Sequence, residues 1–248
     1  HAAIAAGKHV LCEKPIAMNA DEARQLQAAA KKVLIMEAFM VRFHPQWLRA
    51  RELVREGAVG TLRTVQFLFC YSNTDAANIR NKADIGGGAL YDIGCYPITA
   101  GRFFFDAEPT RGIALIDRDP EFRTDRLTSA LVDFGNGRHL DFTVSTQLTP
   151  YQRVHLCGTK GRIEIQIPVN APQDARTELF FDDGSPRGKG ARTEKMPKSD
   201  QYRLQGDAFS RAIRGEIDLP YGVDNAMRGM QVIDALFRSE TSGRWESI

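Results

Sequence analysis

The pattern of helices and strands changes after about residue 38, and this change limits the folds that the chain can adopt. The first part is predicted to contain a helix over 2–6, a strand over 9–12, a helix over 22–31 and an unbroken apolar strand over 33–36. Such alternation is typical of a parallel sheet that is buried on both faces. Two strands alone do not make a stable sheet. We therefore expect residues 1–38 to be the remnant of a doubly wound α/β domain whose first strands lie upstream.

The rest of the chain is dominated by consecutive strands. Helices are predicted over 45–56, 89–105, 202–213 and 225–239, and strands over 64–69, 128–134, 139–146, 153–157, 162–167 and 178–181. The Asn136-Gly137 pair between two strands is a strong hairpin signal. Strands without intervening helices indicate an antiparallel sheet. We expect residues 39–248 to form an α+β domain with an open, mainly antiparallel sheet, and the Gly-rich stretch 184–198 to be a solvated loop.

The composition excludes several classes of function. The formal net charge is only +2, the hydrophobic fraction is 43%, and the basic residues form no stripe with interleaved aromatics, so neither nucleic acid nor a membrane is an expected partner. The four cysteines are far apart and the five histidines form no HxxxH pair, so we expect no metal site. Unpaired cysteines suit a reducing cytoplasm, where we expect the protein to reside.

The segment Cys12-Glu13-Lys14-Pro15 is the first candidate for chemistry. It follows the strand over 9–12, and open α/β sheets bind their ligands beyond the carboxyl ends of their strands. A lysine at this place can donate to a hydroxyl or carbonyl oxygen of a substrate. The alternative is a surface lysine before a turn proline, and the spacing alone does not decide between them.

The second candidate is the segment 86–97, in which three glycines precede a helix. Glycines let a backbone approach a ligand closely. Asp92 and Tyr96 are four residues apart and so lie on one helix face, with Gly94 leaving room beside it. Pro97 is predicted to kink the helix because it lacks an N–H. An acid and a phenol on one face suit catalysis, but a buried tyrosine beside a capping aspartate would give the same pattern.

Together these segments resemble the glucose–fructose oxidoreductase/inositol dehydrogenase (Gfo/Idh/MocA) family. Residues 6–15, AGKHVLCEKP, resemble its first signature, and Asn78-Ile79-Arg80 with GGGALYDIGCYPI over 86–98 resembles its second. The segments 42–45 (RFHP) and 158–161 (GTKG) also match its usual pattern. The resemblance extends over essentially the whole chain. It implies an NAD- or NADP-dependent enzyme that transfers hydride between nicotinamide and a carbinol carbon of a sugar or diol.

The resemblance also implies roles for individual residues. Lys14 and Asp92 match the catalytic lysine and aspartate of the family, and Arg80, with Glu13 and Lys14, falls at the positions near the nicotinamide. Many members carry histidine where this chain has Tyr96, which indicates a subgroup that includes aldose and dihydrodiol dehydrogenases and counts against inositol dehydrogenase activity. Members often turn sharply after this lysine, so a cis Lys14–Pro15 bond is expected.

Elementary chemistry agrees with these assignments. Alcohol oxidation removes a hydroxyl proton as hydride leaves the carbon, and a Tyr96 phenolate could accept that proton as general base. A nearby Lys14 ammonium is expected to lower the phenol's pKa and to stabilise negative charge on the substrate oxygen. Asp92 would orient this pair or bind a second hydroxyl. His44 is a further candidate for substrate contact, although a structural role beside Pro45 explains it as well.

The dinucleotide fingerprint, a Gly-rich turn after a first strand, does not occur in the sequence, so the choice between NAD and NADP is left open. The chain alone is therefore expected to bind the dinucleotide weakly and to show little activity. A same-family ketose or aldehyde reductase is one alternative, and a non-catalytic sugar-binding or assembly protein is another. A homodimer or higher homo-oligomer formed through the free sheet face is expected, because large exposed apolar patches are rare on monomers.

Overall fold

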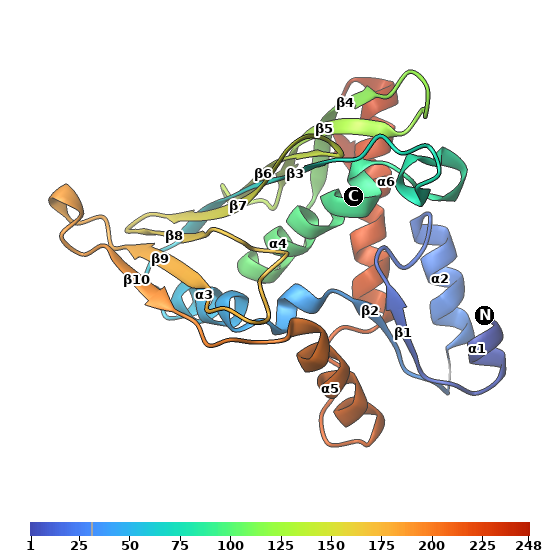
Figure 1. Cartoon of the computed structure of the whole chain (residues 1–248), viewed down its shortest axis with the longest axis horizontal. Coiled ribbons are helices and arrows are strands. Elements are labelled where there is room, and N and C mark those ends of the chain that lie inside the picture. Colours follow the sequence, from blue (N-terminus) through green and yellow to red (C-terminus); the bar gives the residue numbers. More distant parts are fainter. Residues whose placement is uncertain (31) are drawn as a thin grey trace.

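The computed structural model describes residues 1–30 and 32–248 (Figure 1), and its first sheet is the parallel pair expected at the start of the chain. Strands β1 (Val10–Glu13) and β2 (Ile35–Ala38) pair in parallel, with Val10 opposite Ile35. Helix α1 (Ala2–Ala5) precedes β1, and α2 (Ala20–Ala29) connects the two strands. The alternation predicted from the sequence is confirmed, while Lys31, the predicted end of the second helix, lies outside the described residues.

Local interactions set the boundaries of these elements. Gly7 has φ of +67° directly after α1, and the Asn19 side chain accepts the Glu22 N–H at 2.8 Å to cap α2. Strand β2 begins and ends two residues later than predicted. The prediction stopped at Met36 because the next residue, Glu37, is charged, but the strand continues through it. The carboxylate of Glu37 tolerates burial there because its Oε1 accepts the N–H of Ile16 at 2.9 Å.

The second sheet is open, and nine strands of the described residues belong to it in the order β10-β9-β8-β7-β3-β6-β5-β4-β11. Their bounds are β3 Leu62–Ser72, β4 Arg111–Arg118, β5 Asp125–Asp133, β6 His139–Ser145, β7 Gln147–Gly158, β8 Arg162–Ile165, β9 Glu178–Asp182, β10 Arg192–Lys195 and β11 Glu246–Ser247. Neighbouring strands are antiparallel except β3 and β6, which are parallel. The prediction of an open, mainly antiparallel sheet is confirmed.

The hairpin at Asn136-Gly137 is confirmed, but the loop predicted over 184–198 is wrong in part. Strand β5 pairs with β6 across the hairpin, and Gly135, Asn136 and Gly137 all have positive φ. Residues 192–195 form the edge strand β10, paired with β9. This strand is rich in charged residues, and side-chain contacts that cannot be seen in the local sequence hold it in place. For example, the guanidinium carbon of Arg192 lies 4.1 Å from the centroid of the Phe181 ring. Strand β4 was likewise not predicted.

Helices cover one side of the large sheet (Figure 1). These are α3 (Pro45–Arg55), α4 (Cys95–Phe105) and the long α6 (Val223–Ser242), while α5 (Gln201–Ile213) lies beyond them. The shorter helices are η1 Met40–Phe43, η2 Ile79–Asn81, η3 Ala83–Ile85, the π-helical η4 Leu90–Gly94 and η5 Pro186–Gly188. The inward side chains of β6, such as Leu140 and Phe142, are buried beneath these helices. Helix α6 also contacts α2, where the N–H of Ala20 donates to Asp234 at 2.9 Å, so it ties the two sheets together.

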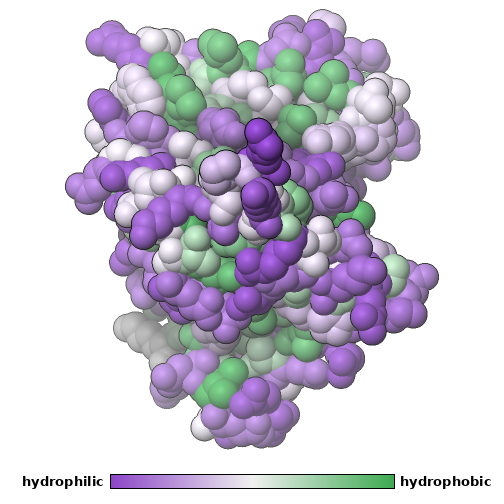
Figure 2. All heavy atoms as spheres, turned by 90° about the vertical axis from the view of Figure 1, so that its left-hand side faces the viewer, coloured by the Kyte–Doolittle hydropathy of each residue, from purple (hydrophilic) through white to green (hydrophobic). Residues whose placement is uncertain are grey.

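The opposite face of the large sheet is hollow and uncovered. Residues of β3, β4, β5, β6 and β7 line a depression of about 740 Å³ there. The exposed fraction is 80% for Leu115 and 47% for Leu131, which both lie in this depression. Figure 2 shows hydrophobic residues near the top of the molecule, on the side away from the helices of Figure 1. The sheet therefore has one face packed on the core and one face free.

Candidate active site

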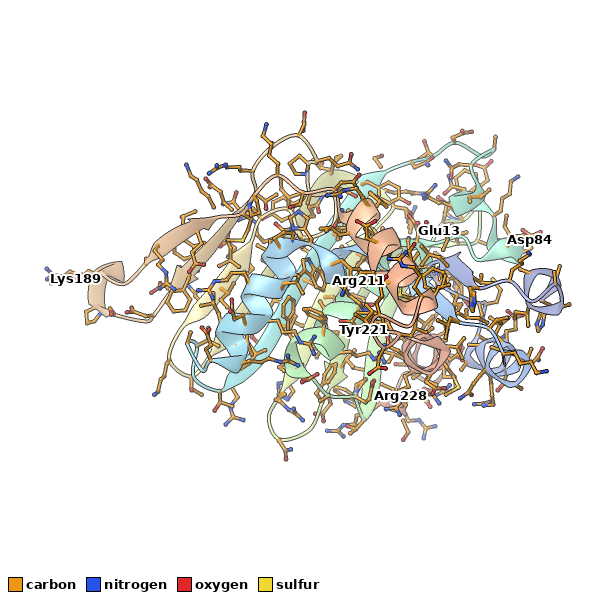
Figure 3. All side chains as sticks on the ribbon, turned by 90° about the horizontal axis from the view of Figure 1, so that it is seen from below. Glu13, Asp84, Lys189, Arg211, Tyr221 and Arg228 are labelled. Atoms are coloured by element: carbon orange, nitrogen blue, oxygen red, sulfur yellow. The ribbon has the colours of Figure 1, made fainter. Side chains whose placement is uncertain are left out.

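A cleft of about 410 Å³ opens at the carboxyl end of β1. Side chains from both sheets and from α5 line it: Glu13, Lys14, Met40, Phe69, Tyr71, Asn73, Arg80, Asp92, Ile93, Tyr96, Val169, Asn170 and Tyr202. The cleft thus brings together Lys14, Asp92 and Tyr96, the three residues singled out by the sequence for catalysis, with Glu13 and Arg80. Figure 3 labels Glu13 in a view from below, in which the helices face the viewer.

Lys14 and Asp92 form a half-buried ion pair across this cleft. The ammonium of Lys14 donates to the backbone carbonyl of Asp92 and lies 3.2 Å from its Oδ1. The Lys14–Pro15 peptide is cis, as expected. Burial alone would lower the pKa of Lys14, but interactions with Cys95 and Asp92 outweigh it and raise the pKa above its usual value. Lys14 therefore carries a positive charge at neutral pH.

Asp92 is the centre of a hydrogen-bonded cluster. Its Oδ2 accepts the hydroxyl of Tyr71 at 2.6 Å and the Nε–H of Arg80 at 2.9 Å. Burial works against the carboxylate, but Lys14, the Tyr71 hydroxyl and Arg80 together hold the pKa of Asp92 below its usual range. The aspartate is thus an anion held by three donors. The role of Tyr71 was not predicted; its position near the end of β3, two residues after the buried Phe69, gave no signal of it.

Tyr96 is buried in an aromatic wall of the cleft. Its ring lies edge-on to Phe39, with centroids 5.6 Å apart, and the Lys14 ammonium lies 5.0 Å from its centroid. Its hydroxyl faces Met40 Sδ at 3.7 Å. The expectation that Lys14 lowers the tyrosine's pKa is wrong for this geometry, because burial raises the pKa of Tyr96 well above 10 and the ammonium lies over the ring rather than at the oxygen. Tyr96 is therefore a neutral phenol at neutral pH.

The glycines before Asp92 serve the protein's own packing, which corrects the expectation that they approach a ligand. A side chain at Gly87 would meet the carbonyl oxygens of Arg80 and Lys82 at 2.6 Å, and one at Gly88 would strike Asp125. None of them lines the cleft. Gly94 likewise makes room for Leu90 and Val144, not for the cleft. These glycines let the loop 80–88 fold tightly against the start of the helix.

The helix predicted over 89–105 is not continuous. Residues 90–94 form a π-helical turn, and the regular α-helix starts at Cys95, two residues before Pro97. Pro97 has no N–H with which to complete the i→i−4 hydrogen bonds of a regular helix, which agrees with the kink expected at this proline. The wide turn carries Asp92, and such turns are frequent at functional sites.

The structure gives His44 a structural position. It is fully buried, and its Nδ1 accepts the N–H of Gln46 at 3.2 Å to cap α3. Burial lowers its pKa to about 4, so it is neutral at physiological pH. His44 is not among the residues that line the cleft. The structural alternative for His44 is therefore the one that the geometry supports.

Two absences among the described residues bear on the chemistry. Within residues 1–30 and 32–248, no cluster of three or more histidine, cysteine, aspartate or glutamate side chains has a geometry that could bind a metal ion. In the same residues, no helix combines the length and the apolar character needed to cross a bilayer.

Comparisons with known proteins agree with this arrangement. Residues 1–39 match the oxidoreductase family with an NAD-binding Rossmann fold, and residues 47–164 match the GFO/IDH/MocA C-terminal domain. An uncharacterised oxidoreductase of Rhizobium meliloti is 42% identical over 246 residues, which cover 98% of this chain and 74% of that protein. The chain belongs to the Gfo/Idh/MocA family of oxidoreductases. The resemblance seen in its two signatures is thereby confirmed.

Several relatives have a named activity. The NADP-dependent D-xylose 1-dehydrogenase 2 of Haloferax volcanii is 33% identical over 96% of this chain and 72% of its own. The trans-1,2-dihydrobenzene-1,2-diol dehydrogenase of Mus musculus is 36% identical over 66% of this chain and 49% of its own. An aldose–aldose oxidoreductase from Caulobacter crescentus, solved with glycerol, superimposes with a TM-score of 0.89 at 28% identity, covering 99% of this chain and 74% of that one.

These relatives confirm the class of enzyme predicted from the sequence. The family is NAD(P)-dependent, and relatives of this chain with a named activity act on sugars or diols. Aldose and dihydrodiol enzymes are the subgroup indicated by the tyrosine at position 96. The non-catalytic alternative gains no support, because the relatives are named as oxidoreductases.

Proposed function

We propose that the protein transfers hydride reversibly between a nicotinamide cofactor and a carbinol carbon of a sugar or diol. The observation that carries this proposal is the convergence of the Lys14 ammonium, the Asp92 carboxylate and the Tyr96 phenol on one cleft at the carboxyl end of β1. In an open α/β sheet this edge is where ligands bind. The three groups supply a charge stabiliser, an orienting anion and a proton donor.

The cleft residues fit a nicotinamide ring at this place. Glu13 and Lys14 extend directly from the end of β1, and Arg80 reaches toward them from η2. The nicotinamide would supply the acceptor for the hydride in oxidation and the hydride itself in reduction. Arg80 and Glu13 would border the ring, while Lys14 projects to the substrate oxygen.

The chain's own groups would handle the proton and the developing charge. In reduction, the neutral Tyr96 hydroxyl donates its proton to the carbonyl oxygen as hydride arrives at the carbon. In oxidation the same proton returns from the carbinol hydroxyl to the tyrosine oxygen. The Lys14 ammonium stabilises negative charge on the reacting oxygen throughout. Asp92 holds Lys14 in position through their ion pair, and Tyr71 and Arg80 hold Asp92.

A polyhydroxylated substrate suits the remaining lining of the cleft. Asn73, Asn170 and the exposed Tyr202 add amide and phenol groups, which bind hydroxyls in either direction of the hydrogen bond. Apolar side chains such as Phe69 and Ile93 complete the wall. A compact molecule with several hydroxyls, or a diol with an apolar ring, would find partners for both parts.

Replacement of Tyr96 tests the proposal. In the intact enzyme, Tyr96→Phe keeps the ring packing and removes the proton, so turnover should fall about 10²- to 10⁴-fold while substrate binding changes little. Lys14→Met should cause a comparable loss. Tyr91→Phe is the matched control, because the Tyr91 hydroxyl donates to the Met18 carbonyl at 2.7 Å and does not line the cleft. Near-normal turnover of Tyr96→Phe with an oxidisable sugar or diol would overturn the assignment.

We also propose a homodimer or higher homo-oligomer in which the uncovered face of the large sheet meets a second copy. Exposed apolar side chains in its depression, such as Leu68, Leu115 and Leu131, support this arrangement, because monomers rarely expose a large apolar patch. All four cysteines are free thiols, which suits the reducing cytoplasm that we propose as its compartment. Residues 1–38 would form the cofactor part and 39–248 the substrate and association part.

A further inference from the structure

A second, smaller pocket of about 280 Å³ lies apart from the cleft, where η1, α3, α4 and α6 meet. Ten residues line it: Arg42, Arg51, Arg102, Phe103, Asp106, Ala107, Glu108, Tyr221, Asn225 and Arg228. None of them lines the cleft described above. Figure 3 shows Tyr221 and Arg228 near each other on the helical side of the molecule.

Arg42 is the unusual residue of this pocket. Only 3% of it is exposed, yet its guanidinium makes no hydrogen bond to any described residue, and its Nη1 is buried without a partner. The guanidinium is stacked between two aromatic rings, 4.3 Å from the Tyr221 centroid and 5.0 Å from that of Phe39. Burial lowers its pKa to about 10, which still leaves it charged at neutral pH. A buried cation without an acceptor is costly, and proteins normally pair such a group.

The carboxylates in the pocket are already engaged by other arginines. Arg102 binds Glu108 through two hydrogen bonds of 2.6 and 2.9 Å. Arg51 donates to Asp106 at 2.9 Å. Arg228, which is mostly exposed, approaches Glu108 at 3.7 Å. The lining therefore holds four guanidinium groups and two carboxylates. Both carboxylates are paired with arginines other than Arg42.

The one further acid near Arg42 does not satisfy it. Glu37 is buried and contributes to the charge environment of Arg42, but it lies beyond ion-pair distance and its Oε1 accepts the Ile16 N–H. Burial also raises the pKa of Glu37, which weakens its anionic form. Guanidinium donors thus converge on an opening without a complementary anion.

We propose that this pocket binds a small oxyanion, a phosphate or carboxylate group, with Arg42 as its principal donor. The planar guanidinium presents a fork of N–H donors that matches two oxygens of such a group. The two rings hold the fork in place before the anion arrives, so little side-chain entropy is lost on binding. Arg228 adds a second cation from α6, on the rim of the pocket.

Thermal unfolding with added anions tests the proposal. The melting temperature of the intact enzyme is measured with inorganic phosphate, with succinate and with chloride at equal ionic strength, without cofactor and again with saturating NADP. Phosphate or succinate should raise the melting temperature by several degrees more than chloride, and NADP should not abolish the effect, because the two sites are separate. Whichever of the two anions acts more strongly identifies the group.

Two variants connect the effect to the pocket. Arg42→Met should weaken the anion's apparent affinity roughly 10- to 100-fold, in keeping with the loss of a charged hydrogen bond. It should also leave the anion-free protein equally or more stable, because an apolar side chain suits this buried place. Arg228→Gln should weaken binding less, below about fivefold, as its charge is exposed. Arg24→Gln on α2 is the matched control and should change nothing.

Several results would contradict an anion site in this pocket. Equal stabilisation by chloride, or no stabilisation by phosphate and succinate at millimolar concentration, would overturn the proposal. Unchanged phosphate affinity in both Arg42→Met and Arg228→Gln would do the same. Loss of anion binding in Arg24→Gln as well would assign the effect to overall charge rather than to this pocket.

Discussion

The hydroxyl of Tyr71 lies 2.6 Å from Oδ2 of Asp92, on the side of the carboxylate opposite to the oxygen that faces Lys14. The two residues are 21 positions apart, on β3 and on the π-helical turn. Tyr71 thus fixes the orientation of the carboxylate that in turn holds the lysine. Its contribution is indirect, since it acts through Asp92.

Removal of this hydroxyl should affect the pH dependence of the reaction. In Tyr71→Phe the carboxylate loses a donor, so the pKa of Asp92 rises and the acid limb of the kcat/KM profile moves to higher pH. Turnover at neutral pH should fall roughly 3- to 30-fold, equivalent to a hydrogen bond to a charged group. The measurement is kcat/KM from about pH 4 to pH 9, with Tyr91→Phe as control. A loss of turnover without any shift of the acid limb would instead indicate a packing role.

The raised pKa of Tyr96 leads to a difference between the two directions of reaction. Burial keeps the phenol protonated at neutral pH, which is the form that reduction needs. Oxidation needs the deprotonated form, whose fraction grows tenfold per pH unit below the pKa. We therefore expect kcat/KM for oxidation to rise with a slope near one between about pH 6 and 9, while that for reduction stays flat. Profiles in both directions on one substrate pair check this, and a flat oxidation profile would contradict it.

His44 should matter for stability rather than for turnover. Its folded pKa is about 4, below the usual 6.5, so the unfolded chain binds more protons between these values. The stability from neutral His44 is present above pH ~6.5 and is lost as the pH falls toward ~4, by up to about 3 kcal/mol. In His44→Asn this loss should disappear, because asparagine caps a helix without titrating. Urea unfolding at several pH values measures the difference.

Turnover of the same variant separates the two roles of His44. If the histidine only caps α3, His44→Asn keeps nearly normal kcat/KM at a temperature where it stays folded. A large drop in kcat/KM with unchanged stability would return His44 to the substrate site.

Periodicity and turn signals in the sequence were enough for most of the architecture. The apolar strand expected over 33–36, found two residues later, and the Asn136-Gly137 hairpin are local features whose outcome depends on few neighbours. Strand β10 could not be found in this way, because Arg192 and Glu194 are stabilised there by Phe181 and Arg49, which are distant in sequence. Glu37 in β2 depends similarly on the Ile16 N–H.

The site shows the same division. Lys14, Asp92 and Tyr96 were recognised through sequence signatures and meet in the cleft. Their protonation could not be predicted, because it depends on which atom of Tyr96 the ammonium approaches and on how deeply the phenol is buried. Tyr71 was missed because a tyrosine on a strand gives the same pattern whether its hydroxyl meets solvent or a carboxylate.

The final prediction concerns the uncovered face of the large sheet. Leu131 on β5 is 47% exposed on that face, and Leu115 on the neighbouring strand β4 is 80% exposed. If a second copy covers this face, Leu131→Asp places an unpaired charge in a desolvated interface, which is costly. Sedimentation velocity at micromolar concentration should then show the variant as a monomer and the unmodified protein as a dimer or larger. Leu48→Asp is the matched control, because Leu48 is 49% exposed on α3, on the helical side, and should leave the association unchanged.

Since the sheet's hydrophobic core faces the helices, Leu131→Asp should fold normally, and circular dichroism verifies that. An unmodified protein that sediments as a monomer would refute the proposed association, whereas dissociation by Leu48→Asp alone would move the interface to the helical side.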